Sequence, residues 1–266
     1  MRLTRIDLLL RGIILLGGLV ASCGSAWAVS GDCAYTNSAT DSGGTGMGGT
    51  GDVAEGTGIG GTGIRLGVYI NEMQLAGNVV ISQGAVEAQR NGHARILAKG
   101  DPVCAGDTLI TSLSGSVQIR MADGGLIAVR PQTQLKIEKF VYRGTDKDSS
   151  LLILTKGACR IITGKIGKRY PQNDIIKTPA ATIGVHEADH EVAVVLPADS
   201  TGYPSGTYDK VNHGFTSIRT EKGEVDIHLN QAGFAADIGE LPILLNEIPS
   251  FYNTNSSVKQ EDGSSE

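Results

Sequence analysis

Short runs of alternating apolar and polar residues, broken by Gly, Asp or Pro, dominate the chain from about residue 65 onward. Residues 117–121 alternate Val, Ile and Met with Gln and Arg, which places the apolar side chains on one face of a strand. A turn at residues 123–125 leads into an apolar return run at residues 126–129. Gly or Pro interrupts almost every window long enough for an amphipathic helix. The pattern predicts an all-β fold, sandwich or barrel-like, of many short antiparallel strands.

The same reasoning places further strands along the chain. Lys156 and Gly157 predict a tight turn between two strands, and residues 221–223 predict another. Aromatic residues make up only 5% of the sequence, so Val, Ile, Leu and Ala must build most of the core. The further predicted strands are residues 135–141, 151–154, 158–162, 181–185, 191–196, 216–220 and 225–229.

Residues 1–28 have the composition of a signal peptide. Three Arg residues form a positive start, an apolar run follows over residues 12–21, and Ala26-Trp27-Ala28 offers small residues at a cleavage site. The apolar run is too short for a bilayer span of roughly 20 residues. We therefore expect an exported protein, periplasmic or associated with the outer envelope, with no transmembrane segment in the mature chain.

A second reading of the same region is lipidation. Residues 20–23 read Val-Ala-Ser-Cys, which looks like a bacterial lipobox with Cys23 as the lipidated residue. Cleavage after Ala28 competes with it. Loss of residues 1–28 leaves 20 basic and 27 acidic residues, a formal charge of −7. That charge argues against nucleic acid or an anionic membrane surface as the main partner.

The composition divides the chain into segments. Residues 29–64 form a Gly/Thr-rich linker, in which the octad at 44–51 recurs at 56–63. So few large apolar side chains cannot offset the entropy of ordering, so the linker is expected to be disordered. The remaining expected segments are a β domain at 65–197, a β-rich extension at 198–247 and a disordered tail at 248–266.

Export makes disulfides permissible. The candidates are Cys33, Cys104 and Cys159, with Cys23 if it is retained. Spacing does not determine the connectivity. Cys104 and Cys159 both lie inside the expected folded region, so they are the first pair that we expect.

An ordered series of short motifs resembles the FecR domain. The series starts near Gly77 and passes through Gly106-Asp107, Ala122-Asp123-Gly124-Gly125 and Thr163-Gly164-Lys165 to residues 178–185. Each Gly-Asp or Asp-Gly marks a reversal followed by a short β-branched run, so the motifs are expected to serve the fold. The resemblance implies an extracytoplasmic β domain linked to envelope signalling. The cytoplasmic and membrane-spanning parts of the best-known members are not seen here, so their sigma-regulator role is not carried over.

Residues 186–190 read His-Glu-Ala-Asp-His, which matches the zincin signature H-E-x-x-H. In a zincin this motif lies on a helix, with both His on zinc and the Glu as general base. Here the flanks are β-branched, and related domains have a hairpin turn at this register. We expect a strand-edge or hairpin segment without catalytic zinc.

The remaining histidines and two glycine-rich motifs offer weaker functional signals. In an extended strand His186 and His190 would share a face because four is even, so they remain weak candidates for a metal site. His93, His213 and His228 are isolated in sequence, and we expect each to be a surface residue or one whose hydrogen bonds are satisfied. The G-x-G-x-x-G matches at 46–51 and 58–63 lie inside the repeat without a βαβ unit and are chance matches.

These observations favour a non-enzymatic binding or scaffold module of the bacterial cell envelope. Its expected partner is an envelope protein or glycan, and no cofactor is expected. The alternative is a zinc-dependent hydrolase that uses His186, Glu187 and His190. A helix at residues 184–192 would favour the hydrolase, and a strand or hairpin would favour the binding module.

Overall fold

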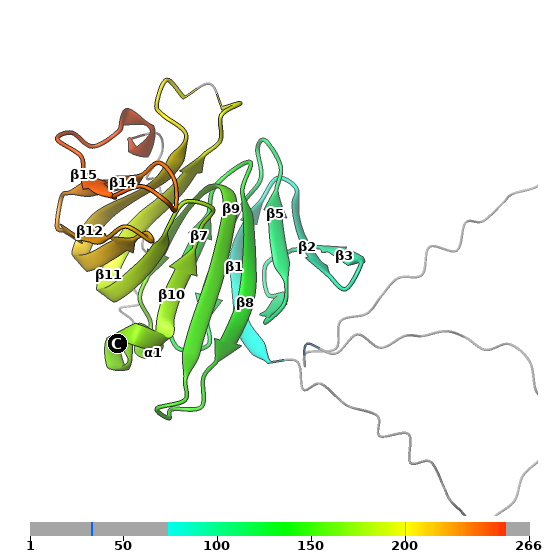
Figure 1. The fold of residues 1–266 in the computed structure, drawn as a ribbon. Coiled ribbons are helices and arrows are strands. Elements are labelled where there is room, and N and C mark those ends of the chain that lie inside the picture. Colours follow the sequence, from blue (N-terminus) through cyan, green and yellow to red (C-terminus); the bar gives the residue numbers. More distant parts are fainter. Residues whose placement is uncertain (1–32, 34–73, 200, 254–266) are drawn as a thin grey trace, which may run out of the picture.

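The computed structural model describes Cys33, residues 74–199 and residues 201–253 (Figure 1). The predicted signal peptide, the candidate lipidation site Cys23 and most of the Gly/Thr-rich linker lie outside the described residues. Residues 254–266 of the predicted tail lie outside them as well. No helix among the described residues is long and apolar enough to cross a membrane.

Strands form almost all of the regular structure, which confirms the all-β class. The helical elements are short: α1 (Lys165–Arg169), η1 (Pro171–Asn173) and η2 (Ser250–Tyr252). The strands are β1 (Leu75–Gln83), β2 (Val86–Arg90), β3 (His93–Ile96), β4 (Pro102–Cys104), β5 (Thr108–Thr111), β6 (Ser116–Met121), β7 (Leu126–Val129), β8 (Gln134–Val141), β9 (Ser149–Ile162), β10 (Asp174–Lys177), β11 (Thr182–Val195), β12 (Gly206–Arg219), β13 (Glu224–His228), β14 (Ala232–Ala235) and β15 (Ile243–Leu244).

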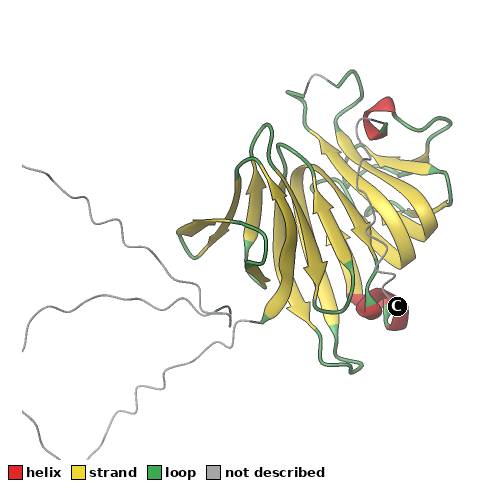
Figure 2. Ribbon diagram, turned by 180° about the vertical axis from the view of Figure 1, so that it is seen from behind, coloured by secondary structure: helices red, strands yellow, loops and turns green. Residues whose placement is uncertain are grey.

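The long strand β9 joins two branches of one hydrogen-bonded sheet. One branch runs in the order β15-β14-β12-β11-β10-β9-β7-β6-β1-β4, and the other leaves β9 through β8 to β5, β2 and β3. The first half of β9 pairs with β8 and, in parallel, with β10, whereas its second half pairs with β7 and β11. Figures 1 and 2 show the sheet folding back on itself from opposite sides. A strand that changes partners in this way turns the corner between two layers.

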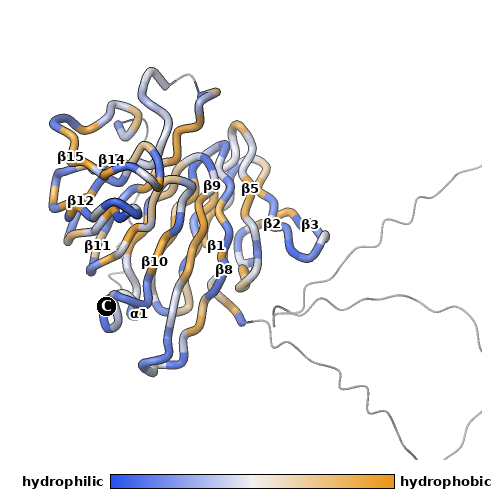
Figure 3. The backbone as a smooth tube through the Cα atoms, viewed as in Figure 1, coloured by the Kyte–Doolittle hydropathy of each residue, from blue (hydrophilic) through white to orange (hydrophobic). Residues whose placement is uncertain are grey.

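The apolar faces of both branches enclose a common core. On β6, Val117, Ile119 and Met121 are buried, as the alternation predicts, and they join one cluster with residues of β8 and β11. Figure 3 shows hydrophobic positions along the strands and hydrophilic ones at the β2–β3 hairpin tip and in α1. Burial of this continuous apolar surface is the main stabilising contribution to the fold.

The tight turn predicted at Lys156 and Gly157 is wrong, because β9 continues through it as one strand. Gly157 has a φ of +81°, and an added Cβ there would lie 2.6 Å from Thr133 Cα. The β8–β9 register shifts beside it. A glycine that suits a turn also suits a bend within a strand, and the tertiary pairing of β9 selects the bend.

The predicted disordered tail is wrong over residues 248–253. Tyr252 of η2 is 2% exposed and belongs to a second apolar cluster with Tyr208 of β12, while Phe251 packs partly buried against that cluster. The backbone N–H of Ser250 donates to the Tyr203 hydroxyl at 2.8 Å. Two adjacent aromatic rings cover the outer face of β11 and β12, which offsets the entropy of ordering this short segment.

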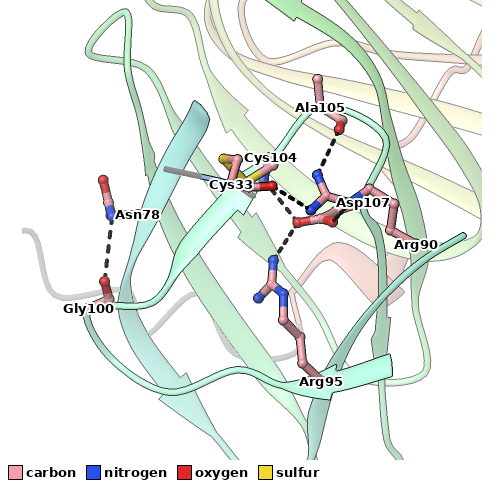
Figure 4. Close-up of a disulfide and its surroundings, with 8 residues drawn as sticks. All are labelled: Cys33, Asn78, Arg90, Arg95, Gly100, Cys104, Ala105 and Asp107. Carbon is pink, nitrogen blue, oxygen red and sulfur yellow. Dashed lines mark hydrogen bonds and ion pairs between the residues drawn. A yellow bond between two sulfur atoms is a disulfide. The ribbon is translucent and has the colours of Figure 1, made fainter. Parts of the chain in front are cut away.

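The predicted Cys104–Cys159 pair is also wrong. Cys104 bonds to Cys33, with 5.9 Å between the two Cα atoms (Figure 4). Cys159 is a buried free thiol. Cys159 lies in the second half of β9, and the three strands β7, β6 and β1 separate it from β4, which carries Cys104. The observed bridge joins residues 71 positions apart, and closing such a loop restricts the unfolded chain by about 4 kcal/mol.

A buried ion cluster holds the disulfide in place. The Asp107 carboxylate is fully buried and pairs with Arg95 at 2.5 Å and with Arg90 at 3.4 Å, and it accepts a hydrogen bond from the Cys104 N–H at 2.9 Å. Arg90 also donates to the Cys33 carbonyl at 3.0 Å (Figure 4). One of the Gly-Asp reversals seen in the sequence therefore anchors the bridge.

Candidate binding site at the bend of β11 and β12

The His-Glu-Ala-Asp-His motif lies within strand β11. His186 pairs with Phe215 of β12 and Asp189 pairs with His213, so two residues of β11 face the single residue Gly214. Glu187 has a φ of +48° and Gly214 a φ of +71°. This β-bulge bends both strands sharply. A zincin needs the motif on a helix, so the zinc-hydrolase alternative lacks its scaffold here.

The bulge also corrects the expectation that the two histidines share a face. His190 is fully buried on the inner face of β11, while His186 lies on the outer face and is stacked on Phe215. An extra residue between them inverts the alternation, because each residue inserted in a strand moves the next side chain to the opposite face. The weak metal site formed by His186 and His190 is therefore not assembled.

His190 belongs to a buried polar cluster. Its Nδ1 lies 2.8 Å from Asp209 Oδ1, and the Thr216 hydroxyl donates to Asp209 Oδ2 at 2.6 Å. Burial favours the neutral imidazole, but the charge and hydrogen bond of Asp209 outweigh it and raise the pKa of His190. For the carboxyl group of nearby Asp174, burial acts in the opposite direction and raises the pKa to about 6. The cluster is closed to ligands and stabilises the junction of β11 with β12.

On the outer face, three rings form a row across three neighbouring strands. His186 of β11 and Phe215 of β12 are register partners, with ring centroids 4.3 Å apart and only 6° between the ring planes. Phe215 is also the register partner of His228 of β13, at 5.7 Å between centroids. Phe215 is 36% exposed. Because the planes of His186 and Phe215 are stacked on each other, the row presents mainly ring edges to solvent.

A pocket of about 400 Å³ lies beside the ring row. Lys168 of α1 and Glu187 of the bulge form an ion pair at 3.4 Å, with side chains 50% and 66% exposed. A pair this exposed contributes little to stability and is free to exchange partners. The pocket is lined by Gly167, Lys168, Pro171, His186, Glu187, His213, Gly214 and Phe215.

The outer face continues from the ring row into a half-buried charged strip. Arg160 of β9 holds Asp189 of β11 with two hydrogen bonds, at 2.8 and 2.5 Å. Burial opposes ionisation of Asp189, but the bonds and the charge of Arg160 outweigh it and lower its pKa. Glu191 pairs with Arg130 and, at 3.4 Å, with Lys210. The carboxylates of the strip are thus neutralised by their neighbours.

Sequence reasoning singled out His186, Glu187 and His190 but missed Phe215, His213 and His228 as members of a site. His213 and His228 are 15 positions apart in the sequence. The pairing of β11 with β12 and of β12 with β13 places both of them near His186. Only the strand register could have revealed this. Cys159, a candidate for a disulfide, takes no part; burial raises the pKa of its thiol to about 12.

The motif series serves the fold, as the sequence analysis expects. Asp123 accepts hydrogen bonds from the backbone N–H of Gly125 and of Ile166, each at 3.1 Å. The Asp-Gly-Gly motif thereby holds the start of α1, 40 residues further along. Thr163 and Ala188 exchange two hydrogen bonds, at 2.8 and 2.9 Å, across the bulge. These contacts position the basic helix and the bend that together form the pocket.

The described residues form an all-β module in which the sequence motifs hold the fold and a pocket opens to solvent. The family model described as FecR protein matches residues 107–202. The match confirms the resemblance seen in the sequence, as a FecR domain over these residues. A FecR domain is consistent with a non-enzymatic module linked to envelope signalling.

Several solved structures are similar to parts of the chain. Two crystal structures of a "putative anti-sigma factor" from Parabacteroides distasonis ATCC 8503 share 13% identity with it, at TM-scores of 0.42 and 0.43. Each match covers 55% of this chain and 62% of the other, so the chain spans less than two thirds of those proteins. A "cell surface anchoring domain" is 34% identical over 23% of this chain and 82% of its own, at a TM-score of 0.23. No curated protein matches the chain.

Proposed function

We propose that the protein is an exported, non-enzymatic binding module of the bacterial cell envelope and that its ligand site is the pocket beside the ring row. Support for export comes from the positive start, apolar run and Ala26-Trp27-Ala28 of residues 1–28. The FecR domain supports the link to the envelope.

The observation that carries the binding role is the register-matched row of His186, Phe215 and His228. Three rings aligned across three strands, with Phe215 left 36% exposed, form a preorganised surface beside a concave space. Its volume of about 400 Å³ falls in the range of small-ligand pockets, roughly 300–1,000 Å³. Phe215 differs from the other exposed apolar side chains because it lies in a row of rings and lines a pocket.

The test is capture from envelope extract with the tagged protein purified from the periplasm. Wild type should retain a saturable ligand, and Phe215→Ala should retain about one tenth as much, because the aromatic side chain that lines the pocket is lost. The matched control is Leu113→Ala, which removes another exposed apolar side chain, 76% exposed, between β5 and β6. Equal loss in both variants, or capture that Phe215→Ala leaves unchanged, would contradict the proposed site.

Export is tested separately by the intact mass of the periplasmic protein. A mature chain beginning at Val29 is the expected product, and a diacylated chain beginning at Cys23 would indicate a lipid anchor. Full-length protein confined to the cytoplasm would contradict export.

A further inference from the structure

The sheet ends in a short strand with exposed apolar side chains. β15 is the last strand in the hydrogen-bonded order, and among the described strands it pairs only with β14. Its two residues, Ile243 and Leu244, are exposed, as are Ile238 and Leu241 just before it. Apolar side chains gathered at a free strand edge mark a surface on which another chain can pair.

The free edge of β15 also presents backbone groups for pairing. The Leu245 N–H donates to the Ala232 carbonyl of β14 at 2.8 Å. Backbone groups of successive residues in an antiparallel strand point to opposite sides, so the N–H and C=O of Leu244 point away from β14. An extended segment laid along β15 can exchange hydrogen bonds with Leu244 while its side chains contact the apolar ones of this edge.

The segment that carries this edge is acidic. Residues 236–247 include Asp237, Glu240 and Glu247 and no Lys or Arg. All three side chains are exposed, and they form no ion pair with any residue that the structure describes. Asp237 accepts a hydrogen bond from the Gly239 N–H of its own turn at 2.9 Å. The carboxylates are therefore available to a cationic partner.

The neighbouring hairpin does not neutralise these carboxylates. The β12–β13 turn contacts the segment through the Glu221 N–H, which donates to the Ile238 carbonyl at 2.9 Å. That turn adds one acidic residue, Glu221, and one basic residue, Lys222. Their charges cancel, so the edge keeps the formal charge of −3 that the three carboxylates give it. A second copy of this chain would bring like charges together across the edge, whereas a basic segment would be attracted.

From the free edge and its charge we infer that β15 binds an extended, apolar and basic segment of another protein by strand addition. This surface is separate from the pocket beside the ring row and does not depend on the function proposed for that pocket. The backbone of Leu244 supplies the pairing, the exposed apolar side chains supply contact area, and the carboxylates select Lys or Arg in the partner.

Strand β3 offers an internal comparison at the opposite end of the molecule (Figure 1). The Leu97 N–H donates to the Val86 carbonyl at 2.9 Å, so the Ile96 N–H points away from β2 by the same alternation. Ile96 is exposed, but β3 carries Arg95 and no acidic residue. The two edges therefore match in backbone and differ in charge.

The experiment titrates the full mature protein with two capped eight-residue peptides, one alternating valine with lysine and one alternating valine with glutamate. Calorimetry gives the affinity, and the NMR signal of the Leu244 amide reports the location. The lysine peptide should bind about tenfold more tightly than the glutamate peptide, and its affinity should fall as the salt concentration rises.

Two variants separate the backbone from the charge. Leu244→Pro removes the N–H on the free side only, a position at which Pro is tolerated, and should weaken binding of the lysine peptide about tenfold. Ile96→Pro makes the same change on β3 and should leave binding unchanged. Asp237→Asn/Glu240→Gln should weaken binding about threefold at low salt and not at high salt. If urea unfolding shows that Leu244→Pro does not fold, the charge variant decides.

Equal affinity for the two peptides, or equal losses in Leu244→Pro and Ile96→Pro, would overturn the inference. So would a dimer in light scattering that Leu244→Pro disrupts, because the occupant would then be a second copy. Phe215→Ala should bind the lysine peptide as wild type does. Failure of the pocket proposal, seen as ligand capture unchanged in Phe215→Ala, would therefore leave this edge surface standing, and loss of peptide binding in that variant would overturn it.

Discussion

The two faces of β11 at the bulge carry histidines of the same short motif in opposite roles. On the inner face, His190 is fully buried and held by Asp209, which is held in turn by Thr216. On the outer face, His186 stacks on the partly exposed Phe215 beside a pocket. The difference teaches that one inserted residue, and not residue type, separates a structural histidine from one available to a ligand.

Removal of Asp209 should have the largest effect on this comparison. Asp209→Ala leaves His190 Nδ1 and the Thr216 hydroxyl buried without their partner, and we expect a loss of about 3–5 kcal/mol in the free energy of unfolding. Asp189→Ala removes the same residue type from the outer face, where the pair with Arg160 is partly exposed, and should cost about 1 kcal/mol. Urea unfolding measures both. Similar losses in the two variants would show that the inner and outer faces of β11 do not differ in how much their carboxylates contribute to stability.

The bulge itself is tested by adding a methyl group at Gly214. In Gly214→Ala the new Cβ would lie 2.9 Å from the Glu187 carbonyl carbon, at a φ of +71°. We expect a loss of about 3 kcal/mol and weaker ligand binding, because the bend must open. Gly144→Ala is the matched control, since Gly144 has a φ of +78° with nothing near its Cβ, and should cost only about 1 kcal/mol. Equal costs would mean that the close approach to Glu187 does not matter.

The inner cluster should also make stability depend on pH. In the folded state the pKa of Asp174 is about 6, against an ordinary value of 3.8. The folded protein therefore binds this proton more tightly, and stability falls as pH rises from about 4 to 6. The raised pKa of His190 acts in the same direction, since its contribution is complete below pH 6.5 and is lost above it.

Asp174→Asn should flatten that profile. The variant cannot ionise, so the loss of stability between pH 4 and pH 7 should shrink by on the order of 2 kcal/mol. Thermal or urea unfolding across this range measures it, with Asp226→Asn on exposed strand β13 as control. An unchanged slope in Asp174→Asn would place the pH dependence elsewhere.

The smallest expected effect concerns chemical access, with no change in stability. In the folded protein, diethyl pyrocarbonate should modify the exposed His213 and His228 and leave His190 unmodified. Cys159 should resist thiol reagents at pH 8, because burial raises the pKa of its thiol to about 12. Peptide mass spectrometry reads out both. Rapid labelling of His190 at native pH would show that the inner face opens.

The sequence alone predicted the all-β class, because period-two alternation in runs such as residues 117–121 depends only on local geometry. The β-branched flanks of residues 186–190 also predicted an extended backbone and argued against a zincin helix. The ordered Gly-Asp motifs predicted the FecR resemblance. Each of these conclusions rests on neighbours within a few positions of one another.

What the sequence could not determine depended on contacts between distant segments. The register of β11 with β12 placed the bulge and separated His186 from His190. Cys104 forms a disulfide with Cys33, 71 positions away in the sequence. Phe251 and Tyr252 pack on a face formed by β11 and β12. The local sequence pattern determines which side chains alternate along a strand. The strand register, the bend in β11 and β12, and the pairing of the cysteines depend instead on how the whole sheet buries apolar surface and pairs its backbone groups. Only the tertiary structure decided them.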